Sequence, residues 1–143
     1  MSQHVTAAQL ITQAWKTAWE AGTLKAAMPV EYKNRRFQQP TDSAWARFTF
    51  LQGKTEPAAL GQKRERTPFF ITLQVFIPKG KGSKQARQAA DITTALNYQV
   101  LTSNDRTITA HFQTASMEDG PEETGFASFN VTISGHYDST RTT

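Results

Sequence analysis

The chain has 143 residues, a formal net charge of +4, a sequence pI near 9.6 and no cysteine. This length favours a single domain, residues 1–143, with room for a hydrophobic core. The absence of cysteine excludes disulfides and thiolate metal sites and suits a reducing compartment. The N-terminus lacks the basic and apolar segments of a signal peptide, and no apolar run approaches the ~20 residues that span a bilayer. We therefore expect a soluble protein.

The first predicted element is an amphipathic helix over residues 6–21. Thr6 and Gln9 have the spacing of a capping box, and Gly22 fits the position after the last turn. Two tryptophans lie in the apolar stripe, and we expect them to pack on a sheet rather than to form a partner site. The stripe consists of Ile11, Ala14, Trp15, Ala18 and Trp19.

Two strands are predicted next. Residues 29–32 favour a short strand, and residues 44–52 favour a longer one that ends at Gly53. In the longer strand Ala46, Phe48 and Phe50 face one way, and Trp45, Arg47, Thr49 and Leu51 face the other. The polar segment 54–67 that follows fits either an extended β-hairpin arm or a mobile loop.

The strongest pattern is a strand, a glycine turn and a helix between residues 67 and 97. One face of the strand is wholly apolar and consists of Phe69, Ile71, Leu73, Val75 and Ile77. The other face is mixed, as if half covered, and consists of Phe70, Thr72, Gln74 and Phe76. Pro78 should end the pairing, Gly80 and Gly82 should form the turn, and Ser83 should cap the helix. The apolar stripe of that helix consists of Ala86, Ala89, Ala90, Ile92 and Leu96.

Two further alternating segments, 106–114 and 126–137, predict the last strands. An acidic loop is expected at 116–125 and a frayed polar tail at 139–143. Four long strands and two helices in this order favour an α+β fold. We expect a mainly antiparallel β-sheet on which the N-terminal helix and the second helix, after the central strand, both pack.

Charges of opposite sign are segregated along the chain. Between residues 61 and 87 there are seven basic residues, Lys63, Arg64, Arg66, Lys79, Lys81, Lys84 and Arg87, against one acid, Glu65. Between residues 116 and 125 there are four acids, Glu118, Asp119, Glu122 and Glu123, and no base. These two sets are candidate interfaces between copies of the chain, since complementary charges steer and register contacts. Two solvated loops of opposite sign are the alternative interpretation.

The sequence offers little that predicts catalysis. His4, His111 and His136 share no metal-ligand spacing, so we expect exposed histidines and no metal site. The turn from Lys79 to Lys84 (KGKGSK) resembles a phosphate-binding loop, but the full nucleotide-binding pattern is absent. A polyanion or carboxylate partner at this turn and a simple solvated turn both remain open.

An ordered series of short motifs resembles one known family. Residues 45–51 (WARFTFL), then Leu60-Gly61, then residues 73–82 (LQVFIPKGKG) and Ala90-Asp91-Ile92 are similar to the tail terminator-like proteins of long-tailed bacteriophages, of the minor tail protein U type. The resemblance is dense from Trp45 to Leu96. It extends loosely to the N-terminal helix and the final strands.

The resemblance implies a structural virion protein at the head–tail junction, assembled in the host cytoplasm. Such proteins form a ring, with a hexamer expected, that caps the tail tube, stops its polymerisation and offers a surface to head-completion or connector proteins. The implied partners are further copies of the chain, the tail tube protein and the connector, with DNA only as cargo in the lumen. No enzyme activity and no cofactor are implied.

Two other functions remain open at this stage. A basic nucleic-acid-binding module is favoured by the pI, by the lysine-rich turn and by Phe70 and Phe76, which we expect to be exposed and able to stack on bases. A neck or head-completion subunit of the same phage junction is the nearest alternative within the resemblance.

Overall fold

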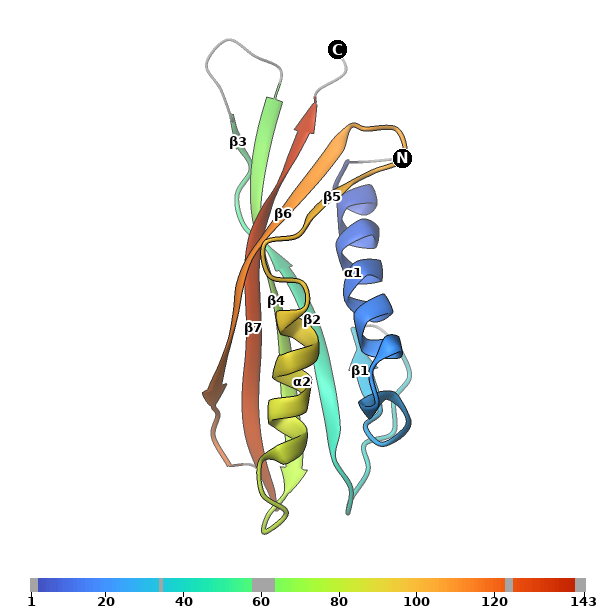
Figure 1. Ribbon diagram of the computed structural model, residues 1–143, viewed down its shortest axis with the longest axis vertical. Helices are drawn as coiled ribbons and strands as arrows, with labels where there is room; N and C mark the ends of the chain where they lie inside the picture. Colours follow the sequence, from blue (N-terminus) through green and yellow to red (C-terminus); the bar gives the residue numbers. More distant parts are fainter. Residues whose placement is uncertain (1–2, 34, 58–63, 123–124, 141–143) are drawn as a thin grey trace.

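The computed structural model describes residues 3–33, 35–57, 64–122 and 125–140 of the chain (Figure 1). The helical elements are α1 (Gln3–Ala21), the 3-10 turn η1 (Leu24–Ala26) and α2 (Lys84–Thr94). The strands are β1 (Val30–Tyr32), β2 (Trp45–Gln52), β3 (Glu56–Pro57), β4 (Arg64–Pro78), β5 (Val100–Thr102), β6 (Ile108–Asp119) and β7 (Phe126–Thr140). Among the helices within these ranges, none has the length and apolar composition needed to cross a membrane.

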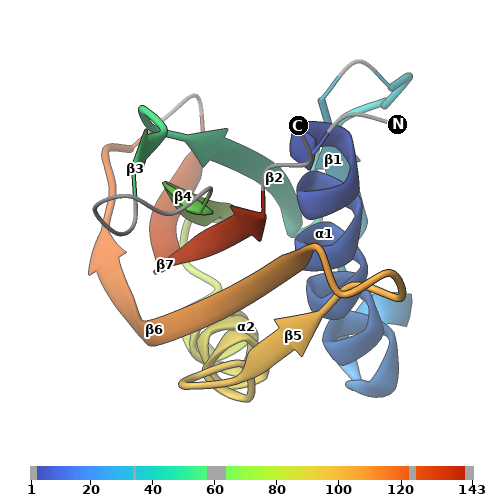
Figure 2. The same ribbon diagram turned by 90° about the horizontal axis from the view of Figure 1, so that it is seen from above.

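The strands form one sheet in the order β1-β2-β4-β7-β6-β5, with β3 added beside the start of β4. The pairing is antiparallel except between β1 and β2, which run parallel. The sheet is strongly curled, as the view from above shows (Figure 2). Both helices lie on the same face of it. The predicted α+β fold, with an N-terminal helix and a second helix packed on a mainly antiparallel sheet, is therefore confirmed.

The core lies between the two helices and the sheet. Trp15 is fully buried, and its ring stacks on Trp19 with the ring centroids 5.2 Å apart. Trp15 also packs on Phe48 of β2, at 4.7 Å between centroids. The tryptophans of α1 thus pack in the core, as expected. All five apolar residues predicted for the core face of the central strand are buried, namely Phe69, Ile71, Leu73, Val75 and Ile77.

The face of β4 that points away from the helices is covered at one place by stacked aromatic rings. The ring of Trp45 lies over Phe76, with centroids 4.2 Å apart and an angle of 16° between the ring planes. Phe37 packs on Trp45 in turn, and Phe76 is consequently buried. Phe70 on the same face is 46% exposed. Partial aromatic cover therefore explains the mixed pattern of this strand face.

Neither predicted N-terminal helix cap forms, although Gly22 directly follows the last residue of α1, as predicted. The helix α1 begins at Gln3, so Thr6 lies inside the helix and cannot head a capping box. Ser83 does occupy the position before α2, but its side chain makes no capping hydrogen bond. Its hydroxyl oxygen instead accepts a hydrogen bond from Nε of Arg87 at 3.3 Å. The turn itself is as predicted, because Gly80 and Gly82 adopt positive φ angles.

Two strands extend further than predicted. The strand β6 continues to Asp119, so the first part of the expected acidic loop is a strand, paired with β7. The strand β7 continues to Thr140, and Ser139 is buried. The expectation of a frayed tail is therefore wrong for these two residues. Residues 141–143 lie outside the described residues.

The described part of the segment 54–67 forms a hairpin arm. Glu56 of β3 is opposite Arg66 of β4, and Pro57 is opposite Glu65. Of the two alternatives left open by the sequence, the described residues therefore support the arm; residues 58–63 lie outside them. The strand β5 was not predicted, because three residues are too few for an alternation to be recognised.

Substitution of Gly135 tests how closely the central strands pack. A Cβ atom at this position would lie 2.6 Å from Cζ of Phe69 and closer still to the backbone oxygen of His111. We expect Gly135→Ala to lower the free energy of unfolding by about 2–3 kcal/mol, measured by urea denaturation, because the core must shift. Ser134→Ala, on the solvated side of the same strand, should cost less than about 1 kcal/mol. Equal losses would contradict this packing.

Candidate functional site

The candidate basic residues fall at the two opposite ends of β4. Arg64 and Arg66 open the strand, whereas Lys79 directly follows its last residue. Fifteen residues at about 3.3 Å per residue separate these groups by about 45 Å. We refer to the end with Arg64 and Arg66 as the arm end and to the end with Lys79 as the turn end. The candidate residues therefore form two distinct charged sites rather than one.

At the arm end, Arg66 forms a bidentate ion pair with Asp138 of β7. Its Nε and a terminal guanidinium nitrogen donate to the two carboxylate oxygens at 2.8 and 3.1 Å. A terminal nitrogen of Arg64 lies 3.7 Å from the same carboxylate. The side chain of Asp138 is only 4% exposed. The hydrogen bonds from Arg66 hold the pKa of Asp138 below its usual range and raise that of Arg66.

At the turn end, opposite charges already meet within the chain. Nζ of Lys79 lies 3.2 Å from a carboxylate oxygen of Glu122, and both side chains are more than half exposed. The backbone N–H of Lys79 also donates to the carbonyl of Gly125 at 3.0 Å. A carboxylate partner was one of the two interpretations of the lysine-rich turn. For Lys79 this partner is Glu122 of the same molecule.

The other charged side chains at this end are exposed and form no ion pair within the described residues. The basic ones are Lys81, Lys84 and Arg87, and the acidic ones are Glu118 and Asp119. Lys63 and Glu123, which belong to the predicted sets, lie outside the described residues. These exposed charges are available to another molecule.

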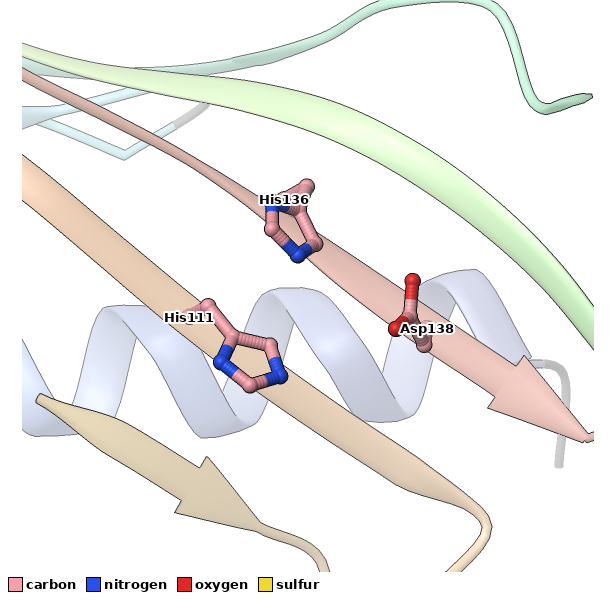
Figure 3. Close-up of side chains that lie close together, drawn as sticks. All are labelled: His111, His136 and Asp138. Carbon is pink, nitrogen blue, oxygen red and sulfur yellow. The ribbon is translucent and has the colours of Figure 1, made fainter. Parts of the chain in front are cut away.

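A cluster that the sequence analysis missed lies on the face of the sheet away from α1. His111 of β6 is opposite His136 of β7, and the two rings stack with centroids 4.9 Å apart (Figure 3). Asp138 lies two residues beyond His136 on the same side of the strand. Burial, followed by the positive charge of Arg66, lowers the pKa of His136. The two-residue spacing of His136 and Asp138 indicates in the sequence that both lie on one face of a strand. The sequence does not indicate that His111 lies opposite His136, because this depends on the register between β6 and β7.

An open depression of about 680 Å³ lies beside this cluster. It is lined by residues of the arm and of three strands, including Glu56, Arg66, Phe70, Gln113 and His136. Phe70 is directly opposite Leu51 of β2, and these side chains are 46% and 54% exposed. The arm end thus combines exposed apolar area with ionic groups.

Comparisons with known proteins identify the family. A family model described as phage tail terminator protein matches residues 10–134. The chain belongs to this family. Among the solved structures that match, one whose name states no function covers 100% of this chain and 99% of its own, with 24% identity and a TM-score of 0.57. That likeness supports the fold alone. No curated protein matches.

Family membership confirms the resemblance found in the sequence. Because members are structural proteins of phage tails, this tail terminator protein has a structural role and its location is the virion tail.

The Arg66–Asp138 pair should contribute strongly to stability in a pH-dependent way. Arg66→Ala leaves a nearly buried carboxylate without its main partner, so we expect a loss of about 2 kcal/mol at pH 7. The folded-state pKa of Asp138 is lowered. The contribution is therefore complete above the unfolded pKa of about 4 and is lost as the pH falls through the folded value. Urea denaturation at pH 7 and pH 3 measures both effects.

Lys79→Ala provides the matched control, because it removes an ion pair whose two side chains are exposed. We expect it to cost less than about 1 kcal/mol at pH 7. If the Arg66→Ala deficit were as large at pH 3 as at pH 7, the charge of Asp138 could not be its cause.

Proposed function

We propose that this tail terminator protein forms a ring, with six copies expected, that caps the completed tail tube at the head–tail junction. One face of the ring binds the end of the tube, and the other face lacks the surface that would accept a further tube ring, so polymerisation stops. That second face binds a head-completion or connector protein, and DNA passes through the lumen as cargo. The family match over residues 10–134 carries this proposal.

The edges of the sheet are suited to contacts between copies. The outer strands β1 and β5 each pair with only three residues of their neighbours, β2 and β6. Much of β2 and of β6 therefore has a ladder partner on only one side within the described residues. Different surfaces at the two edges favour a head-to-tail contact, which closes into a ring when the rotation between subunits allows it.

The exposed charges at the turn end supply complementary surfaces for such a contact. Lys81 and Lys84 lie on the loop and the first residue of α2, whereas Glu118 and Asp119 end β6. In a head-to-tail arrangement the basic set of one copy would face the acidic set of the next. Charge pairs of this kind add orientation and speed to assembly rather than most of its affinity.

The alternative of a nucleic-acid-binding module loses one of its supports in the structure. Phe76 was expected to be exposed for base stacking, but it is 1% exposed beneath the ring of Trp45. Phe70 remains exposed, yet a single aromatic residue is a weak stacking platform. No observation favours a neck or head-completion subunit over the ring-forming cap.

The native mass of the purified protein, measured from low to high micromolar concentration with and without a short DNA duplex, tests the proposal. We expect a closed oligomer that forms without DNA and resists dilution. An oligomer that appears only with DNA would contradict the proposal and support the nucleic-acid module. A protein that stays monomeric even when mixed with tail tubes would also contradict it.

Charge reversal tests the contact between copies. We expect Lys81→Glu combined with Lys84→Glu to raise the concentration at which the oligomer dissociates by at least tenfold at ~50 mM salt, because like charges then face each other. At ~500 mM salt the difference should become small, since exposed charges are screened. Analytical ultracentrifugation over a dilution series gives both values.

The reciprocal variant, Glu118→Lys combined with Asp119→Lys, should have the same defect. Joining all four substitutions in one chain should restore assembly if the two sets face each other. Lys25→Glu combined with Lys33→Glu, at two exposed lysines outside both charged sets, is the control with the same charge change as the Lys81 and Lys84 variant. A combined variant that assembles no better than either double variant would exclude this pairing.

A further inference from the structure

Two imidazole side chains are held side by side by the backbone ladder of the sheet. His111 and His136 are directly opposite residues of β6 and β7, which places their Cβ atoms about 5 Å apart in any antiparallel pair. Their rings are nearly parallel, with 26° between the ring planes. Neither histidine is fully buried, so each ring can rotate without disturbing the core.

A carboxylate completes a possible ligand set on the same face. Asp138 follows His136 by two residues, and Figure 3 shows its carboxylate beside the two rings. One potential ligand atom from each of these three residues lies within 4.8 Å of the others. Tyr137, between His136 and Asp138, points to the opposite face and is fully buried. The three ligand side chains thus project together from one rigid surface.

We propose that His111, His136 and Asp138 bind a divalent transition-metal ion of the zinc class. Two imidazoles and one carboxylate form a ligand set that suits Zn²⁺, with water in the remaining positions. Ligand atoms around tetrahedral Zn²⁺ lie about 3.3 Å apart, as follows from bond lengths of about 2.0 Å. Rotation of the two partly exposed rings closes the remaining distance.

Arg66 is not a ligand of this site but affects its geometry and its affinity for a cation. Its two hydrogen bonds fix the orientation of the Asp138 carboxylate, as a hydrogen-bonding partner of a metal ligand often does. Each carboxylate oxygen retains a further lone pair for the ion. The positive charge of Arg66 opposes a second cation, however. The site is therefore expected to bind Zn²⁺ at micromolar rather than nanomolar concentration.

The chemistry of the ligands predicts its selectivity. Imidazole nitrogens favour Zn²⁺, Ni²⁺ and Cu²⁺, whereas Mg²⁺ and Ca²⁺ require oxygen ligands, of which the site offers one side chain. A bound ion would connect β6 to β7 at the arm end, on the face opposite the helices. This site is independent of the charge pairing proposed for the ring.

Isothermal titration calorimetry of the full chain without an affinity tag tests the proposal, with ZnCl₂ added to one metal-free sample and MgCl₂ to another. We expect one Zn²⁺ per chain with a micromolar Kd and no Mg²⁺ binding. His111→Thr and His136→Thr should each weaken Zn²⁺ binding at least tenfold, and threonine keeps the β-strand propensity of these positions. Asp138→Asn should weaken it as well.

The third histidine supplies the matched control. His4 lies on α1, and its Nδ1 is 2.7 Å from the hydroxyl of Tyr137 on the opposite face of the sheet. His4→Thr should leave Zn²⁺ binding unchanged. A Kd above ~1 mM for the unsubstituted protein, or an equal loss in all three histidine variants, would overturn the proposal.

A measurement on the unsubstituted protein covers the case in which a variant fails to fold. With one equivalent of Cu²⁺, electron paramagnetic resonance should show coupling to two imidazole nitrogens. A spectrum without nitrogen coupling would overturn the proposal. Bound Zn²⁺ at 100 times its Kd should also raise the thermal midpoint by about 5 °C or more.

Discussion

The antiparallel pairing of β4 with β7 is the constraint on which the other contacts depend. Fifteen consecutive residues of each strand are paired, from Arg64 opposite Thr140 to Pro78 opposite Phe126, without a register shift. Because side chains alternate between the faces, a slip of one residue would move the whole apolar set of β4 from the helices to solvent. The burial of that set therefore fixes the register. The same register sets which polar side chains meet on the other face.

This long pair also explains why the two charged ends differ in physical role. At the arm end, a carboxylate that is only 4% exposed requires its arginine partner, since burying an unpaired charge is costly. At the turn end, Lys79 and Glu122 are both well exposed, and an exposed ion pair contributes little. Such a pair can exchange its partner for that of a neighbouring molecule at small cost. The Arg66–Asp138 ion pair and the surface proposed for assembly are thus separated along one strand.

Local patterns predicted the elements well because each depends on residues close in sequence. The alternation from Phe69 to Ile77 identified the central strand and its core face, and the spacing of Trp15 and Trp19 identified the buried stripe of α1. Trp45 was placed on the correct face, but its burial was not foreseen. That burial arises from Phe76 and Phe37, which reach it from another strand and from a loop. Pattern alone does not report such cover.

Side-chain contacts between strands could not be predicted from the sequence, because they depend on the register of the strand pairs. Arg66 and Asp138 are separated by 72 residues, and the bulge between Phe112 and Ala115 changes the alignment of β6 with β7. An extra residue at a bulge shifts the alignment of every later pair. His111 lies before the bulge, so the register of that first part of β6 places it opposite His136. The Arg66–Asp138 ion pair, the histidine pair and the exposed Phe70 all lie near the arm end, where β3 extends the sheet. The arm end therefore brings together the side chains of the proposed metal site, a grouping that no linear motif in the sequence indicates.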